Sequence, residues 1–189
     1  MSGIGSVRLY SSRTPMKLAG RLFLLALLLR WTVVFLAWPM RQDVVGDSFL
    51  HVISIPFHEA GHIIFSPFGD FMMTLGGSLT QVLVPLVCLG AFLTEASFNA
   101  FGAAVMLWWA GENMLDVAIY INDARALQLV LLGGHTGAEV EGHDWEHILL
   151  MTGALHLDHQ LAWSVHVVGA VMMAAGIIWG TIIAVKDKT

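Results

Sequence analysis

Long apolar runs separated by short polar breaks divide the 189-residue chain. These runs cover 22–40, 48–68, most of 71–94, 99–121 and 160–185. A helix needs about 20 apolar residues to cross the hydrocarbon core of a bilayer. Each run therefore predicts a membrane-spanning helix, and a short or re-entrant segment near 148–157 would add a sixth. The pattern predicts an all-α, polytopic membrane helix bundle with five or six spans.

The same pattern predicts almost no β-structure. Lipid accepts only helices or closed barrels, and the alternating pattern of barrel strands is absent. The expected exception is a short β-turn or hairpin near 71–80, because Gly76-Gly77 is a turn signal. The tight polar break at 95–98 predicts that the third and fourth spans form an antiparallel hairpin.

Composition agrees with a membrane protein. Hydrophobic residues make up 57% of the chain and charged residues only 12%, whereas about a quarter of a soluble domain is charged. We expect residues 1–189 to form one integral membrane domain with the lipid bilayer as its first partner. The single cysteine, Cys88, excludes a disulfide framework and a cysteine-based zinc site. The net charge of −5 is not arranged to bind nucleic acid.

The basic segment 1–21 predicts the orientation of the chain. It contains four basic residues and no acid, and positive segments stay in the cytoplasm, so we expect a cytoplasmic N-terminus. The apolar run that follows is long and lacks a small-residue cleavage site, which favours a retained span over a signal peptide. A bacterial cytoplasmic membrane is the expected location. Five spans would place Lys186 and Lys188 outside, and a sixth segment would bring them back inside.

The sequence His-Glu-Ala-Gly-His at 58–62 carries the clearest chemistry. His58 and His62 are four residues apart, so on a helix both imidazoles face the same side and can hold one ion. Zinc in such a site activates water for peptide hydrolysis, and the neighbouring Glu59 can accept the proton. Ionisable groups inside a membrane are costly and usually functional. The alternative is that the three side chains only form hydrogen bonds within the bundle.

At this motif the chain resembles the site-2 protease group of intramembrane zinc peptidases. The resemblance covers about 48–125, is specific only at 58–62, and includes the Gly-Gly pair and Gln81 that follow the motif. It implies a Zn²⁺ cofactor, a transmembrane protein substrate, and a third ligand in a Leu-Asp-Gly segment. Leu115-Asp116 matches the first two residues of that segment. Val117 replaces the glycine, and the family's two preceding prolines are missing.

A catalytic zinc site uses three protein ligands and one open position. Asp116 is the first choice for the third ligand, as the resemblance implies. Glu112 lies one turn earlier on the same face and could be a ligand or a supporting partner. Asn113 could donate a hydrogen bond to a developing oxyanion. We thus expect Glu59 and Asn113 as catalytic residues and His58, His62 and Asp116 as metal ligands.

Other choices for the third ligand remain open. Asp123 is the main rival, although we expect it at the membrane edge. The polar loop 133–147 is rich in histidine and acid, and His143 or Asp144 could also reach the metal. The ordinary interpretation of this loop is a helix start with Asp144 as its N-cap. Arg30, a charge within the first span, could pair with Asp116 or Glu112.

The remaining histidines suggest a second class of function. The pairs at 143/147 and 156/159 have spacings seen at metal sites, and His135 and His166 lie nearby in sequence. Membrane di-iron hydroxylases and desaturases collect histidines in this way, but their paired His-His boxes are absent here. A di-iron redox enzyme is therefore the alternative to a peptidase.

A third possibility is a non-catalytic, zinc-stabilised membrane protein or a subunit of a larger complex. Gly176 and Gly180 form a small-xxx-small motif that could pack against a neighbouring helix or a second chain, so a homo-oligomer or partner subunit is open. Our leading hypothesis is a zinc-dependent intramembrane endopeptidase that cleaves membrane or membrane-adjacent segments. In it, the turn near 71–80 would pair with the extended substrate.

Overall fold

The computed structural model describes residues 13–186, which form seven α-helices and no β-strand. The helices are α1 (Arg13–Ala37), α2 (Gln42–Val45), α3 (Phe49–Phe65), α4 (Asp70–Phe92), α5 (Ala100–Asn122), α6 (Asp144–Met151) and α7 (Asp158–Lys186). Short 3-10 turns precede α4, α5 and α7 at Ser66–Phe68, Glu95–Ser97 and Leu155–Leu157. The all-α prediction is confirmed, and residues 1–12 of the basic N-terminal segment lie outside the described range.

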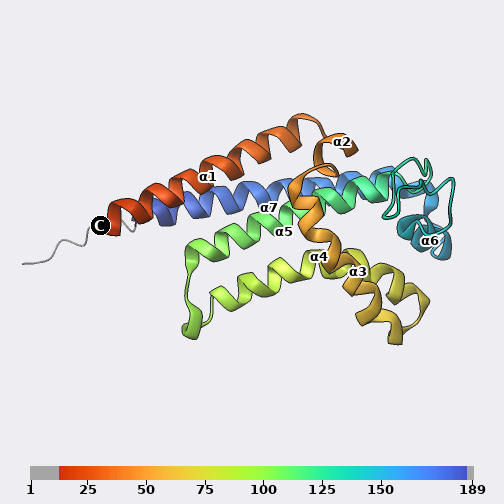
Figure 1. Ribbon diagram of the computed structural model, residues 1–189, viewed down its shortest axis with the longest axis horizontal. Coiled ribbons are helices and arrows are strands. Elements are labelled where there is room, and N and C mark those ends of the chain that lie inside the picture. Colours follow the sequence, from red (N-terminus) through yellow and green to blue (C-terminus); the bar gives the residue numbers. More distant parts are fainter. Residues whose placement is uncertain (1–12, 187–189) are drawn as a thin grey trace, which may run out of the picture.

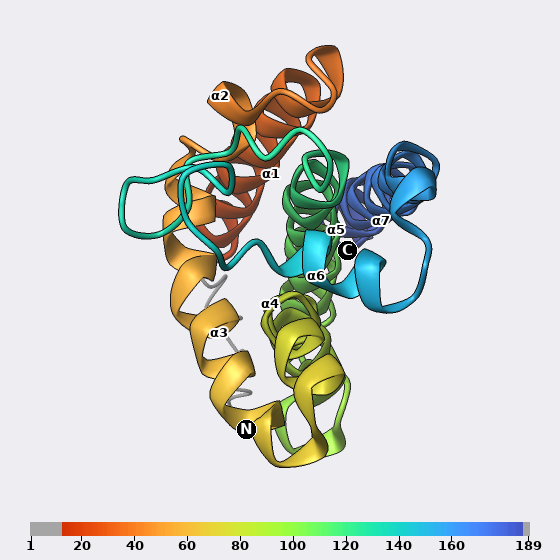
Figure 2. The ribbon, with the colours of Figure 1, turned by 90° about the vertical axis from the view of Figure 1, so that its right-hand side faces the viewer.

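Three helical segments are long and apolar enough to cross a membrane, namely Pro15–Ala37, Asp70–Phe92 and Leu155–Lys186. The chain is thus a membrane protein by length and composition, but the prediction of five or six spans is not supported. The run at 48–68 forms only the 17-residue α3, which lies across the bundle rather than along it (Figures 1 and 2). The segment near 148–157 forms the eight-residue α6 and a 3-10 turn.

The prediction of a β-turn or hairpin near 71–80 was wrong, because α4 runs unbroken through Gly76 and Gly77. These glycines allow α3 to cross α4 at close range. A Cβ atom added to Gly61 on α3 would lie 2.1 Å from the carbonyl oxygen of Gly76. Gly76 therefore marks a helix crossing, where a side chain would push the two backbones apart, whereas Gly77 faces the side chains of His58 and His62.

Helix α5 is the centre of the bundle and packs against α7 along most of its length, with α4 beside it, while α1 packs mainly against α7 (Figure 1). Glycines again set the close approach, because a Cβ atom on Gly111 would lie 2.6 Å from the carbonyl oxygen of Gly169. Gly176 of the small-xxx-small motif packs in the same way against Ala104 and Trp108. The motif therefore packs α7 against α5 within the chain. The expected antiparallel pairing of α4 and α5 is also found.

The two ends of the bundle differ in charge. The start of α1 and the end of α7 lie at one end, whereas α6 and the loop before it lie at the other (Figure 1). The first end carries the basic residues Lys17, Arg21 and Lys186. The second carries seven acids, namely Asp70, Asp123, Glu139, Glu141, Asp144, Glu146 and Asp158. The chain passes along the bundle with α1 and α5 in one direction and α4 and α7 in the other.

Candidate metal centre

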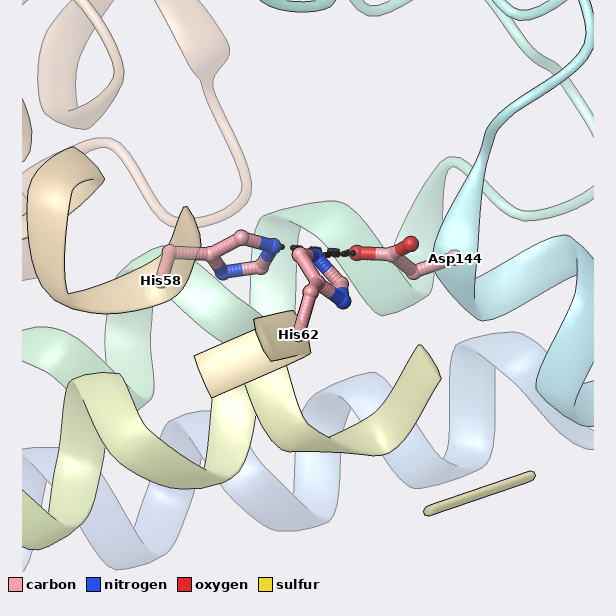
Figure 3. Close-up of side chains that lie close together, drawn as sticks. All are labelled: His58, His62 and Asp144. Carbon is pink, nitrogen blue, oxygen red and sulfur yellow. Dashed lines mark hydrogen bonds and ion pairs between the residues drawn. The ribbon is translucent and has the colours of Figure 1, made fainter. Parts of the chain in front are cut away.

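Three side chains converge at the acidic end of the bundle (Figure 3). His58 and His62 come from neighbouring turns of α3, and Asp144 comes from the first turn of α6. One carboxylate oxygen of Asp144 lies 2.9 Å from Nε2 of His58 and 3.3 Å from Nε2 of His62. Within residues 13–186, this is the one group of three or more potential ligands whose donor atoms all lie within 4.8 Å of one another.

The other ring nitrogen of each histidine is already occupied. Nδ1 of His58 donates to the side-chain oxygen of Gln81 (3.1 Å), and Nδ1 of His62 donates to the carbonyl oxygen of Met73 (2.9 Å). Metal-binding histidines almost always donate their second N–H to such an acceptor, which directs the lone pair of the other nitrogen to the metal. Both imidazoles therefore present Nε2 as a ligand atom on the side where Asp144 lies.

The space beside these atoms depends on Gly77 of α4. A Cβ atom there would lie 2.6 Å from Nε2 of His58 and 2.7 Å from Nε2 of His62. Two imidazoles and one carboxylate are also the donor set of a catalytic zinc site with an open fourth position. The donor chemistry of these residues thus fits a zinc ion, and Gly77 leaves the two Nε2 atoms uncovered by a side chain.

Several contacts hold α6 so that Asp144 faces the histidines. Trp145 donates from Nε1 to the hydroxyl of Ser78 on α4 (3.0 Å). The backbone N–H of Asp144 donates to the hydroxyl of Tyr120 on α5 (3.0 Å). His147 reaches the carboxylate of Asp70 at 2.9 Å. The position of Asp144 is therefore set by both α4 and α5.

The N-cap of α6 is His143, whereas the sequence suggested Asp144. Nδ1 of His143 accepts the backbone N–H of Glu146, and its Nε2 lies 3.3 Å from the carboxylate of Asp123. Burial alone would raise the pKa of Asp123, but His143 and the two backbone N–H groups of Gln128 and Leu129 hold it below its usual value. Asp123 thus anchors the loop that leads to α6.

The charge state of Asp144 suits a metal ligand. Burial would raise the pKa of its carboxyl group, but the adjacent imidazoles of His58 and His62 outweigh burial and lower it. The group is therefore ionised at neutral pH.

A cavity of about 620 Å³ lies in front of the three ligand candidates. Its wall includes Glu59, His51 and Tyr120, together with the loop at 129–135 and 140–142. Glu59 is exposed on α3, next in sequence to His58. The expected proton acceptor thus faces the same open space as the candidate ligands.

Asp116, the expected third ligand, lies outside this group. Its carboxylate accepts from Nδ1 of His51 (2.8 Å) and from the side-chain amide of Gln81 (2.7 Å). The structure therefore places Asp144 next to the histidines and connects Asp116 to His58 only through Gln81. The suggested pairing of Arg30 with Asp116 or Glu112 is wrong, because Arg30 is exposed and no partner is found for it in the described residues.

Most other candidates also lie away from the ligand group. Asn113 is fully buried, donates to the carbonyl oxygen of Trp109 (2.9 Å) and does not line the cavity. Glu112 is fully buried one turn before Asp116. Among the additional histidines, ion-pair contacts with acids are found for His135, His143, His147 and His159. In the part of the chain that the structure describes, His156 and His166 belong to no metal-ligand group either.

Two residues of the site had little support from the sequence. Asp144 was one of several open choices in the acidic loop, since nothing in its spacing connects it to 58–62. Tyr120 was not considered, although it lies one turn after Asp116 on the same face of α5. That spacing is the signal that could have placed Tyr120 at the site.

No family model matches the sequence, and comparisons with curated proteins and with solved structures find no similar protein. The resemblance to the site-2 protease group consequently stays a prediction from the sequence. The functional argument depends on the geometry of the site.

Proposed function

We propose that this protein is a zinc-dependent membrane peptidase that hydrolyses peptide bonds in membrane-adjacent segments. The observation that carries the proposal is the convergence of His58, His62 and Asp144 at a cavity that Glu59 also lines. A bound zinc ion lowers the pKa of a water ligand to about 7 and polarises a peptide carbonyl.

The side chains around the ion have separate roles in this proposal. Glu59 accepts the proton of the attacking water and returns it to the leaving amine, so the net reaction adds one water across the peptide bond. The hydroxyl of Tyr120 accepts the N–H of Asp144, which leaves its own proton to donate to the carbonyl oxygen of the substrate. In this proposal Tyr120, and not Asn113, donates the hydrogen bond to the carbonyl oxygen of the substrate, because Asn113 is buried away from the cavity.

The cavity wall supports an extended peptide as substrate. Apolar side chains of α3, α5 and the loop line it, including Ile55, Val117, Leu129, Val130, Leu131, Leu132 and Val140. Such a surface fits the side chains of a hydrophobic segment, and the nearby polar groups can orient its backbone.

We further propose that α5 crosses the membrane with α1, α4 and α7, while α3 lies across the bundle. Helix α5 is packed between helices long enough to span, and it carries the chain back after α4. With four crossings the start of α1 and the end of α7 lie on one side, which the basic residues of these helices favour as cytoplasmic. The metal centre then faces the opposite side of the membrane.

This arrangement predicts the accessibility of the acidic loop. In a Cys88→Ala background, Glu139→Cys is expected to react with a membrane-impermeant maleimide in intact cells, because Glu139 is exposed in that loop. Lys17→Cys in the same background is the matched control and is expected to react only after the cells are broken. Labelling of Lys17→Cys but not Glu139→Cys in intact cells would reverse the proposed orientation.

The enzymatic proposal is tested with Glu59→Gln. The purified protein in detergent, loaded with zinc, is incubated with a peptide library, and the products are read by mass spectrometry. We expect the parent protein to cleave peptides from the library. Glu59→Gln should cleave them at least about 100-fold more slowly, in line with the loss of a general base. The zinc content should be unchanged, because Glu59 is not one of the three ligands.

The same experiment separates the alternatives. Equal cleavage by Glu59→Gln and the parent would refute the assigned mechanism. Bound zinc without cleavage by either protein would instead favour a non-catalytic, zinc-stabilised protein. A di-iron enzyme needs a second set of ligands close to the first, and the described residues hold one group only.

A further inference from the structure

The side chain of Gln81 lies between a candidate zinc ligand and a carboxylate. Its oxygen accepts from Nδ1 of His58 (3.1 Å), and its amide nitrogen donates to Asp116 (2.7 Å). Gln81 and Asp116 are only 5% and 8% exposed, so bulk water is not a ready substitute for either partner. On its far side the carboxylate of Asp116 is held by Nδ1 of His51 (2.8 Å).

An amide can face His58 in two ways that differ chemically. With its oxygen toward Nδ1, it requires a proton on Nδ1 and leaves the lone pair of Nε2 for a metal. With its NH₂ group toward Nδ1, it requires a lone pair there and favours the tautomer protonated on Nε2, which cannot bind a metal through Nε2. A carboxylate only accepts hydrogen bonds, so Asp116 selects the first orientation.

We propose that Asp116 and Gln81 are positioning residues that hold His58 in its zinc-binding tautomer. This inference rests on the proposed zinc site and gives Asp116 a role different from that of a ligand. The carboxylate of Asp116 sets the orientation of the Gln81 amide. The amide oxygen then keeps the proton on Nδ1 of His58, so the lone pair of Nε2 is available on the side of Asp144. His62 needs no such pair of positioning residues, because its Nδ1 faces the backbone oxygen of Met73, which can only accept a hydrogen bond.

The first variant is Asp116→Asn, which keeps the shape of the side chain. An asparagine can present either its oxygen or its NH₂ group to Gln81, so the amide of Gln81 is free to reverse. We expect zinc affinity, measured by competition with a chromophoric chelator, to fall about 10- to 100-fold, as for other partners of metal-bound histidines. The visible spectrum of the Co²⁺-loaded protein should keep its shape, since the ligands are unchanged.

Glu112→Gln is the matched control. It makes the same acid-to-amide change one turn earlier on α5, at a fully buried side chain that forms no hydrogen bond with Gln81. Zinc affinity should equal that of the parent. An equal loss in both variants would show that replacement of any buried acid on α5 weakens the site, and would overturn the proposal.

The decisive variant is the double exchange Asp116→Asn with Gln81→Glu. A carboxylate at position 81 can only accept, so it again requires the proton on Nδ1 of His58, and the asparagine amide at position 116 can donate to it. Zinc affinity should return to within about threefold of the parent, whereas loss of packing alone would make the double variant worse than Asp116→Asn. No recovery, with the helical content intact, contradicts the proposal.

The outcomes of these experiments distinguish a failure of this inference from a failure of the proposed function. If the parent protein binds no zinc, the metal site itself fails. If the parent binds zinc and Asp116→Asn binds it equally well, only the positioning role fails. If Asp116→Asn changes the Co²⁺ spectrum to that of a site with fewer protein ligands, Asp116 is a ligand and the proposal is also overturned.

Discussion

A protein with Asp144→Asn is expected to bind zinc more than about 100-fold more weakly than the parent, a larger loss than outer partners of metal sites cause. An asparagine supplies no negative charge and is a poor zinc ligand, so the ion would be left with two imidazoles. Asp144 also lies within 2.9 Å of His58 and 3.3 Å of His62, so its charge holds the two rings together. Competition with a chromophoric chelator measures the loss.

Glu146→Gln is the control for that experiment. It makes the same chemical change two residues later on α6 and lies outside the ligand group. Zinc affinity should be unchanged. If Asp144→Asn lost less affinity than Asp116→Asn, the third ligand would be Asp116, as the resemblance implied, and our assignment of the site would be wrong.

The second large effect is expected for Gly77→Ala. The new Cβ atom would lie 2.6–2.7 Å from Nε2 of both histidines, closer than such contacts allow, so both ligand atoms must shift from their present positions. We expect at least about tenfold weaker zinc binding, because ligand distances in such sites tolerate shifts of only a few tenths of an ångström. The fold should survive, since alanine favours a helix over glycine by about 1 kcal/mol.

Gly90→Ala provides the comparison on the same helix. A Cβ atom there meets nothing within 4 Å, so neither zinc binding nor helical content should change. Zinc affinity of Gly77→Ala equal to that of Gly90→Ala would mean that the ion does not bind beside Gly77. Thermal unfolding, followed by circular dichroism, separates a damaged site from a damaged fold.

Hydropathy alone predicted the helices well. The apolar runs at 99–121 and 160–185 coincide closely with α5 and α7, and the break at 95–98 forms the turn between α4 and α5. Hydropathy does not give the orientation of a helix relative to the bundle, however. The apolar run at 48–68 therefore predicts a span, although α3 lies across the bundle. Gly76-Gly77 is a turn signal in the local sequence, but in the fold Gly76 permits a close crossing with Gly61 of another helix, which no local pattern encodes.

The candidate site was predictable only in its local part. His58 and His62 lie one helical turn apart, so their spacing alone brings them to one side, and Glu59 is next in sequence to His58. Asp144 is 86 residues from His58, and its position depends on contacts of α6 with Ser78 and Tyr120 that no local pattern encodes. Asp116 matched a family motif, but in the fold Gln81 lies between it and His58.

The most direct test of the zinc site is elemental analysis of the full chain, purified in detergent after expression with added zinc. His58→Ala, prepared in the same way and checked for helical content, is measured beside it. Our account predicts about one zinc per chain in the parent and little in the variant. A folded parent protein that contains no zinc, or a variant that retains the full amount, would contradict it.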